Sequence, residues 1–594
     1  MKDRKDIDKK YTWDLEKIYS SIDVFNADYD NVKSMIHNLS KYEDNMMDNS
    51  SNFYDTISLS FDIERIIDKL YVYTSLSFDL DTSNNECQEL CEKVQNLHSQ
   101  YVKNSYFIVP SILKCNKELI DKYFEEEPKL NDYVTSINEI YRYKEHTLSD
   151  KEEKLLSSMG KIMGNSYDTY ELFKDCDMTF DDIENEDGKK VELNDSSYSL
   201  YMESRNREVR KNAFMNLYKE YRKYANTFAS LLSTQMKELS AIASVSNYKT
   251  AIERSLFADD VSIGVYNNLI DSVHSNISYL HDYYKLKKEL LELEELHLYD
   301  VYVPIVNNYD KKYSFDEAKD IIIRVLNVFG DEYIEKVKEA LDNRWIDVYP
   351  TKNKRSGGYS GGSYDTYPYI LLNYQDKYND MSTLIHEMGH SMHSYYSRKY
   401  NPYQDSEYRI FVAEVASTVN ELLLSKYMIE HSNSKEEKLF ILNNLMELYR
   451  ATIYRQTMFA EFEKNISSMI DNEEAITANK LCDTYYNLNK FYFGEDVVID
   501  DEIKYEWTRI PHFYYNFYVY KYATGLSAAT VIVNNILNGN DNAVDNYIEF
   551  LKCGGSKSPI ESLKVAGVDL TDKSVIDGAL SEFKNVIDMY RESI

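Results

Sequence analysis

Glycine and proline are scarce in this sequence of 594 residues, which contains 17 Gly and 8 Pro. Average usage is roughly 7% for Gly and roughly 5% for Pro, so the residues that interrupt helices fall well below their ordinary share. No run of apolar residues approaches the roughly 18 that a membrane-spanning helix requires. The sequence therefore predicts a mainly α-helical protein with long helices and without a membrane partner.

Cysteine is also rare, and its six positions are scattered along the chain. Cys87 and Cys91 have helical spacing, but no second Cys or His pair lies near them, so neither a disulfide framework nor a zinc ribbon is predicted. The N-terminal segment lacks the apolar stretch of a secretory signal. We therefore expect reduced thiols and a cytoplasmic location.

Basic residues are outnumbered, because 68 Lys and Arg stand against 100 Asp and Glu, and the formal net charge is -32. Such a surface repels phosphate groups, so we expect neither nucleic acid nor an anionic membrane as a partner. The charge says nothing about the substrate, and the oligomeric state stays uncertain at this level.

One helical motif indicates metal chemistry. Residues 384–396, LIHEMGHSMHSYY, contain His386 and His390 with Glu387 directly after the first histidine. Positions i and i+4 of a helix lie on one face, so both imidazoles can bind one metal ion while Glu387 lies beside it. A catalytic zinc keeps one position for water, which Glu387 can deprotonate. The alternative is an exposed helix with two solvated histidines, although chance supplies only about 0.02 such motifs in a chain of this kind.

A catalytic zinc usually has a third protein ligand. The metzincin pattern would place Gly and His at the third and sixth positions after the second histidine, where this chain has His393 and Tyr396. Glu414 instead lies in an almost wholly apolar helix predicted over residues 410–424, where an unpaired carboxylate is costly to bury. We therefore predict Glu414 as the third ligand; the alternative is a solvated glutamate on a partly exposed helix.

Two neighbouring residues are expected to have other roles. Glu421 lies seven residues after Glu414 on the same helix face and could orient a ligand histidine. His393 lies about 10 Å along the helix from His386, so we expect it to be structural or to face the substrate rather than to bind the metal.

Short β-structure is predicted around this helix. Residues 367–374, YPYILLNY, are typical of a buried strand, and an extended peptide could add to it if its edge is open. Residues 355–363, RSGGYSGGS, hold four of the 17 glycines and predict a loop, either a mobile flap over substrate or an ordinary surface loop. We also predict a hairpin at Asp187 and Gly188 and strands near residues 298–305 and 345–349.

Tyrosine is concentrated near the C-terminus in residues 509–526, RIPHFYYNFYVYKYATGL. A helix beginning at Pro511 would place Tyr515 and Tyr522 on one face, with His512 close by. Phenol and imidazole donors can stabilise the oxyanion that forms when a carbonyl is attacked. The alternative is an aromatic core helix.

Four segments, in this order, resemble the oligoendopeptidase F group of the thimet oligopeptidase family of zinc metallopeptidases. They are PYILLNY, HEMGHSMHSYYS, FVAEVASTVNE and RIPHFYYNFYVYKYATG. The resemblance covers roughly residues 204–589, and the N-terminal part resembles the accessory domain of the family more weakly. It implies an elongated, two-part helical zincin with a deep channel and a small β-sheet beside the zinc helix. The implied domains are an accessory domain over residues 1–200 and a catalytic domain over residues 201–594.

The resemblance also implies the chemistry and the site. One zinc ion per chain would activate water for the hydrolysis of short, unfolded oligopeptides. The residues that match the motifs of the family are His386, His390 and Glu414 as zinc ligands, Glu387 as general base, and His512, Tyr515 and Tyr522 as the C-terminal His and Tyr group. The spacing after His512 is shorter here than in the thimet branch, and this departure concerns Tyr515 above all.

Other functions remain open from the residues alone. A carboxypeptidase or dipeptidyl carboxypeptidase on the same scaffold would need a cation for the terminal carboxylate of the substrate, and Arg355 and Arg509 are candidates. A peptide-binding scaffold with structural zinc would need a fourth protein ligand, and none is found near Glu414. An all-helical interaction protein would bind no metal, and cobalt or manganese could replace zinc on the same ligands.

Overall fold

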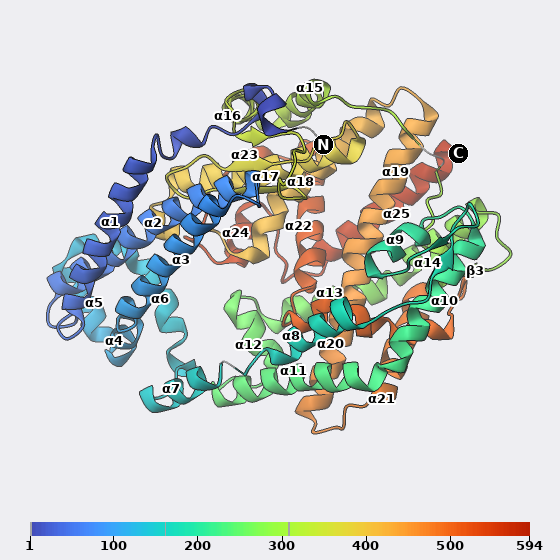
Figure 1. Cartoon of the computed structure of the whole chain (residues 1–594). Helices are drawn as coiled ribbons and strands as arrows, with labels where there is room; N and C mark the ends of the chain where they lie inside the picture. The colour runs from blue at the N-terminus through green and yellow to red at the C-terminus, as the bar shows by residue number, and fades with distance from the viewer. Residues whose placement is uncertain (1–2, 161, 307–308) are drawn as a thin grey trace. The chain divides into compact units, whose positions relative to one another are not determined.

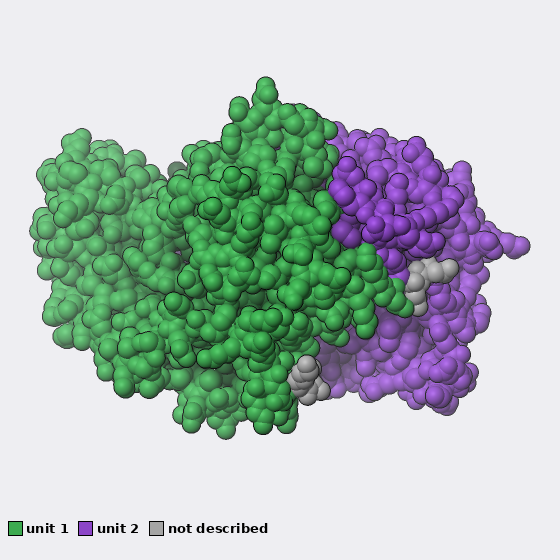
Figure 2. All heavy atoms as spheres, turned by 90° about the horizontal axis from the view of Figure 1, so that it is seen from above, with its two compact units in different colours: residues 1–145, 310–427, 532–567 green, residues 146–309, 428–531, 568–594 purple. Residues whose placement is uncertain are grey.

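The computed structural model describes residues 3–160, 162–306 and 309–594, and most of them lie in helices (Figure 1). The predicted mainly helical fold with small sheets is confirmed. The chain forms two compact units, which Figure 2 distinguishes by colour. Unit 1 contains residues 1–145, 310–427 and 532–567, and unit 2 contains residues 146–309, 428–531 and 568–594. The domain boundary at residue 200 and the deep channel stay predictions.

Helices of unit 1 begin at side chains that accept hydrogen bonds from the free N–H groups of the first turn. Ser21 caps α1 (Ile22–Leu39) in this way, and Asn49 caps α2 (Ser50–Leu80). The other helices of the unit are α3 (Asn85–Ser105), α4 (Ile108–Lys114), α5 (Lys117–Glu126), α6 (Val134–Arg142), α15 (Phe315–Leu326), α16 (Asp331–Asp342), α17 (Tyr378–Tyr400), most of α18 (Ile410–Glu430), α23 (Ala543–Lys552) and α24 (Pro559–Val565).

Unit 2 is also mainly helical and includes α10 (Arg207–Lys223) and α11 (Ala225–Val245). Its other helices are α7 (Asp150–Met159), α8 (Asn165–Leu172), α9 (Asp195–Met202), α12 (Ala251–Ala258), α13 (Ile263–Ser275), α14 (Ile277–Leu290), α19 (Lys435–Tyr449), α20 (Arg455–Asp471), α21 (Ala478–Phe493), α25 (Ser574–Ser593) and the first part of α22 (Tyr520–Leu537).

Three short strands form the sheet of unit 1 in the order β4-β6-β5. β4 (Ile346–Asp347) runs parallel to β6 (Tyr369–Leu371), and β5 (Tyr359–Gly361) pairs antiparallel on the other side of β6. The predicted strand within residues 367–374 is therefore confirmed, but no peptide can add to it, because its condition of an open edge is not met and both of its sides are paired. The two outer strands are β4 and β5, and β5 forms within the Gly-rich segment.

The two remaining sheets show one success and one error of prediction. The hairpin predicted at Gly188 is confirmed by antiparallel β1 (Ile183–Glu184) and β2 (Lys190–Val191). The strand predicted over residues 298–305 is wrong, because β3 (Leu296–His297), which pairs with β7 (Val497–Val498), ends before it. The chain then turns because the buried Asp300 carboxylate accepts from the backbone N–H of His297 and forms ion pairs with Arg207 and Arg210.

The N-terminal helices share one hydrophobic core with the sheet of unit 1. Buried residues of α1, α2 and α3 cluster with Tyr369 and Leu371 of β6. Trp13 reaches the same strand, since its indole N–H donates to the Ile370 carbonyl oxygen at 2.8 Å. Residues 1–145 therefore support the sheet from which the chain continues into α17.

Among the described residues, no helix combines the length and the apolar character needed to cross a bilayer. All six cysteines are free, in agreement with the predicted reduced thiols.

The helix predicted from Pro511 through Tyr522 is broken. A 3-10 helix covers Pro511–Tyr514, and α22 begins only at Tyr520. Between them Asn516 and Phe517 have φ angles of 56° and 60°, a left-handed conformation in which no helix continues. Tyr515 and Tyr522 therefore do not lie on one helix face.

Buried polar contacts hold this strained turn in unit 2. Glu463 of α20 is fully buried, and its Oε1 atom accepts the N–H of Phe517 at 3.1 Å. Its Oε2 atom has no hydrogen-bond partner among the described residues. Ser255 donates to the Asn516 carbonyl oxygen, and Gln235 donates to the Asn516 side chain. Burial raises the pKa of Glu463 to about 8, against the weaker opposing effect of the Phe517 N–H.

We expect Glu463→Gln to remove a pH dependence of stability. The raised pKa means that the folded chain holds this proton more tightly than the unfolded chain, so the stabilisation is complete below about pH 4.5 and declines as the pH rises toward 8. Glutamine keeps the carbonyl acceptor for Phe517 without a titrating proton. Urea unfolding midpoints at pH 5 and pH 8 should therefore differ less in the variant than in the natural sequence.

Glu294→Gln, at an exposed position of the same unit, is the matched control and should keep the full pH difference. An unchanged pH difference in Glu463→Gln would contradict the assignment of this proton.

Candidate metal centre

Close packing of α17 against α18 positions the predicted ligands. A Cβ atom at Gly389 would lie 2.6 Å from the Ala416 carbonyl oxygen and 2.6 Å from Ser417 Cα, so only glycine allows this approach. The side-chain amide of Asn420 donates to the Ile385 carbonyl oxygen and ties the helices together at the next turn.

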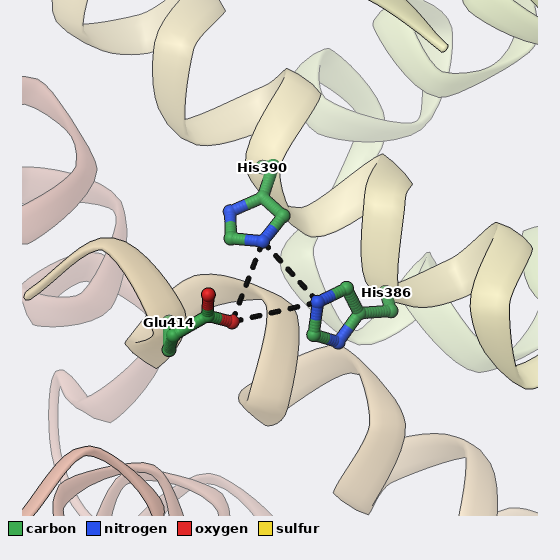
Figure 3. Close-up of side chains that lie close together, drawn as sticks. All are labelled: His386, His390 and Glu414. Atoms are coloured by element: carbon green, nitrogen blue, oxygen red, sulfur yellow. Dashed lines mark hydrogen bonds and ion pairs between the residues drawn. The ribbon is translucent and has the colours of Figure 1, made fainter. Parts of the chain in front are cut away.

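Three side chains meet at this contact (Figure 3). The Nε2 atoms of His386 and His390 lie 3.2 Å apart, and each is 3.4 Å from the Glu414 Oε2 atom. Zinc ligands at roughly 2.0–2.1 Å from the ion lie about 3.3 Å from one another in a tetrahedron. The donor set and its spacing therefore fit zinc, and the partial exposure of Glu414 leaves room at the fourth position.

The charges around the cluster favour a cation. Burial opposes a charge on His386, but the nearby carboxylates, first of all Glu421, outweigh this effect and raise the pKa of His386 to about 9. Burial would also raise the pKa of Glu414, but His390 and His386 lower it to about 2. The position between the rings therefore stabilises positive charge, which a divalent metal ion would also provide.

Side chains around the cluster hold its members in place. Ser417 donates to the Glu414 Oε2 atom at 3.1 Å, and the Glu421 Oε1 atom lies 3.3 Å from His386 Nδ1. The predicted orienting residue Glu421 therefore lies beside the histidine that it was expected to support.

Glu387 lies next to the cluster in a more enclosed environment. The residue is 7% exposed, and burial raises the pKa of its carboxyl group. The backbone of Ser360 in β5 lies close to this carboxyl group and lowers its pKa, an effect that is weaker than that of burial. A carboxylate with a raised pKa beside a metal centre is suited to accept and return a proton.

His393 is separate from the cluster. Its ring is 1% exposed and stacks on Tyr408 with a centroid distance of 3.7 Å, and burial lowers its pKa to about 3. The prediction that His393 is not a metal ligand agrees with this position, and its role is structural packing.

The predicted C-terminal group is also compact. The His512 ring centroid lies 5.3 Å from that of Tyr515 and 6.2 Å from that of Tyr522, although no continuous helix joins them. Burial lowers the pKa of His512, and the hydroxyl groups of Tyr515 and Tyr167 lie 2.9 Å apart. These residues belong to unit 2 and the metal-ligand candidates to unit 1, so a shared active site stays a prediction.

Both arginines considered for a substrate carboxylate already have acidic partners. Arg355 Nε lies 2.8 Å from the Asp79 Oδ1 atom, and Arg509 Nε lies 2.9 Å from the Asp195 Oδ1 atom. An arginine engaged in this way is a poor candidate for holding a terminal carboxylate.

The residues that anchor the Gly-rich segment were not predicted from the sequence. Asp79 at the end of α2 accepts hydrogen bonds from the Tyr359 hydroxyl at 2.6 Å and, through its carbonyl oxygen, from the Arg355 N–H. Ser360, which follows Tyr359 in β5, contacts Ser391 of α17. No local pattern marks these residues, because they are distant in sequence and meet only in the folded chain.

Comparison with known proteins agrees with this geometry. The Peptidase family M3 profile matches residues 200–582, and the Oligopeptidase F profile matches residues 111–180. Oligopeptidase PepF from Bacillus subtilis is 42% identical over 590 residues, which cover 99% of this chain and 88% of the relative. An oligoendopeptidase F homolog from Lactococcus lactis is 37% identical over 585 residues, 98% of this chain and 97% of the relative.

Solved structures agree with the fold. Oligoendopeptidase-F from Enterococcus faecium superimposes with a TM-score of 0.74 at 34% identity, over 96% of this chain and 98% of that chain. A structure from Chlamydophila abortus gives a TM-score of 0.94 at 36% identity, over 100% of both chains. The family profile spans more than half of the chain, and the relatives align along nearly all of it. This chain therefore belongs to peptidase family M3.

Proposed function

We propose that this peptidase binds one zinc ion through His386, His390 and Glu414 and cuts oligopeptides at internal bonds. The observation that carries the proposal is the triangle of donor atoms with sides of 3.2, 3.4 and 3.4 Å beside the Glu387 carboxylate. Zinc at this position would supply a Lewis acid for the scissile carbonyl and would lower the pKa of a water molecule there.

Glu387 is proposed as the general base. Its burial raises its proton affinity, so it can take a proton from the attacking water and later give it to the leaving amine.

His512, Tyr522 and Tyr515 are proposed to donate hydrogen bonds to the tetrahedral oxyanion. Burial keeps His512 neutral near pH 7, so one ring nitrogen is a donor without a full charge. A well-placed donor to an oxyanion contributes roughly 3–4 kcal/mol. Tyr515 is 39% exposed, and its hydroxyl group is hydrogen-bonded to that of Tyr167. Tyr515 would have to exchange this partner for the substrate.

The substrate class, the domain roles and the compartment complete the proposal. We propose short, unfolded oligopeptides as substrates, because several relatives are named oligopeptidases or oligoendopeptidases. The family match over residues 200–582 supports a catalytic domain over residues 201–594, with residues 1–200 as accessory domain. A cytoplasmic location is supported by the free cysteines.

Digestion of a peptide mixture tests the proposal directly. Peptides of different lengths, each with a free or an amidated C-terminus, should be cut at internal bonds, and a chelator should abolish cleavage. Mass spectrometry of the products identifies the cut bonds. Cleavage restricted to the last one or two residues of peptides with a free carboxylate would instead indicate a carboxypeptidase or dipeptidyl carboxypeptidase.

Glu387→Gln should retain zinc but lose most activity, because general-base catalysis contributes roughly 10²–10⁴-fold to the rate. Zinc content is measured by atomic emission and turnover with a quenched fluorescent peptide. Glu430→Gln, at an exposed position near the end of α18, is the matched control and should keep both. Normal turnover in zinc-loaded Glu387→Gln would refute the role of this residue.

A further inference from the structure

β5 presents a free edge beside the proposed general base. It is one of the two outer strands of the order β4-β6-β5, so one of its sides has no strand partner in the part of the chain that the structure describes. The Oγ atom of Ser360, in the middle of β5, lies 2.8 Å from the Ser391 Oγ atom of α17, the helix that carries Glu387. An extended peptide added to this edge would therefore pass the reacting groups.

The other face of β5 borders a large cavity. Successive residues of a strand point to opposite faces, and Tyr359 and Gly361 lie on the face opposite to Ser360. Both line a cavity of about 740 Å³, and most of its other lining residues belong to α2 and α3, which run side by side (Figure 1). Every second side chain of a peptide on this edge would point toward the cavity.

One wall of the cavity is apolar, and most of the charged residues that line the cavity are acidic. Tyr71, Val72, Leu76 and Phe78 of α2 provide the apolar part. The acidic lining residues are Asp68, Asp79, Glu92 and Glu407, and the cationic one is Arg355.

Two of these carboxylates are neutralised by arginines. Asp79 forms an ion pair with Arg355, and Glu407 forms one with Arg398 at 3.1 Å. Asp68 of α2 and Glu92 of α3 have no Lys or Arg within 4.0 Å among the described residues, and Asp68 accepts only the hydroxyl of Tyr403. The cavity therefore has two carboxylates without a Lys or Arg in contact, next to an apolar wall.

We propose that this cavity is a substrate subsite that takes the side chain of an arginine or lysine residue of the bound peptide. The aliphatic part of such a side chain packs on the apolar wall while its cationic end meets Asp68 and Glu92. The inference rests on the proposed endopeptidase function and adds a specificity to it. Because strand side chains alternate, the preference applies to one position, or to positions two residues apart, and not to neighbouring positions.

A matched set of quenched peptides tests this subsite. Each peptide carries one arginine, moved stepwise along an otherwise neutral sequence, and its partner carries citrulline, which has the same shape without the charge. Cut bonds are identified by mass. Two exposed ion pairs give an expected ratio of kcat/KM for the arginine peptide to kcat/KM for the citrulline peptide of about fivefold at the position that faces the cavity. At the neighbouring positions this ratio should be near one. Raising the salt concentration should reduce the preference.

Variants distinguish the effect of the cavity carboxylates from the effect of the overall negative charge of the protein. Asp68→Asn together with Glu92→Gln should bring the arginine-to-citrulline ratio close to one. Asp62→Asn with Glu89→Gln, exposed positions on the same two helices that do not line the cavity, should keep the full ratio. Both pairs remove the same number of charges, so net charge alone cannot explain a difference.

The possible failures are distinguishable. Equal cleavage of arginine and citrulline peptides at every position would overturn the subsite while leaving the endopeptidase function intact. A preference that survives in Asp68→Asn with Glu92→Gln would also overturn it. If no peptide is cut at all, the proposed function fails and the subsite fails with it.

Discussion

The close approach of α17 and α18 is the contact on which the rest of the site depends. Gly389 has no side chain, so the backbone of one helix lies against that of the other, and the histidines of α17 come within 3.4 Å of Glu414 on α18. A larger residue at position 389 would push the helices apart by more than the tolerance of a metal–ligand bond. The contact thus connects a packing constraint in the core with the chemistry of the cluster.

The N-terminal helices support the sheet that lies beside the site. They share a hydrophobic core with β6, and Asp79 at the end of α2 holds both Tyr359 and Arg355 of the Gly-rich segment. That segment is therefore anchored at two points and forms an outer strand of the sheet. Through Ser360, this strand contacts Ser391 of α17, the helix that carries Glu387. The position of the general base is consequently coupled to residues about 300 positions earlier in the chain.

Local patterns predicted the features that depend on local physics. Helical spacing placed His386 and His390 on one face, and the cost of burying a lone carboxylate singled out Glu414, which the structure brings to the same point. The errors arose where distant residues override local preference. The chain turns at Asp300, where a strand was predicted, because Asp300 is buried against two arginines. The predicted helix is interrupted by the left-handed residues after Tyr515, which the distant Glu463 holds in place. Strand order, and with it the open edge of β5, could not be read from a single sequence.

The central claim is that two imidazole nitrogens and one carboxylate oxygen bind a single zinc ion. X-ray absorption at the zinc edge, recorded on protein that contains one zinc per chain, tests it most directly. The account predicts four light ligands at about 2.0–2.1 Å, with the multiple-scattering signal of two histidines and no sulfur. A six-oxygen shell without the histidine signal, or a sulfur shell near 2.3 Å, would contradict the account.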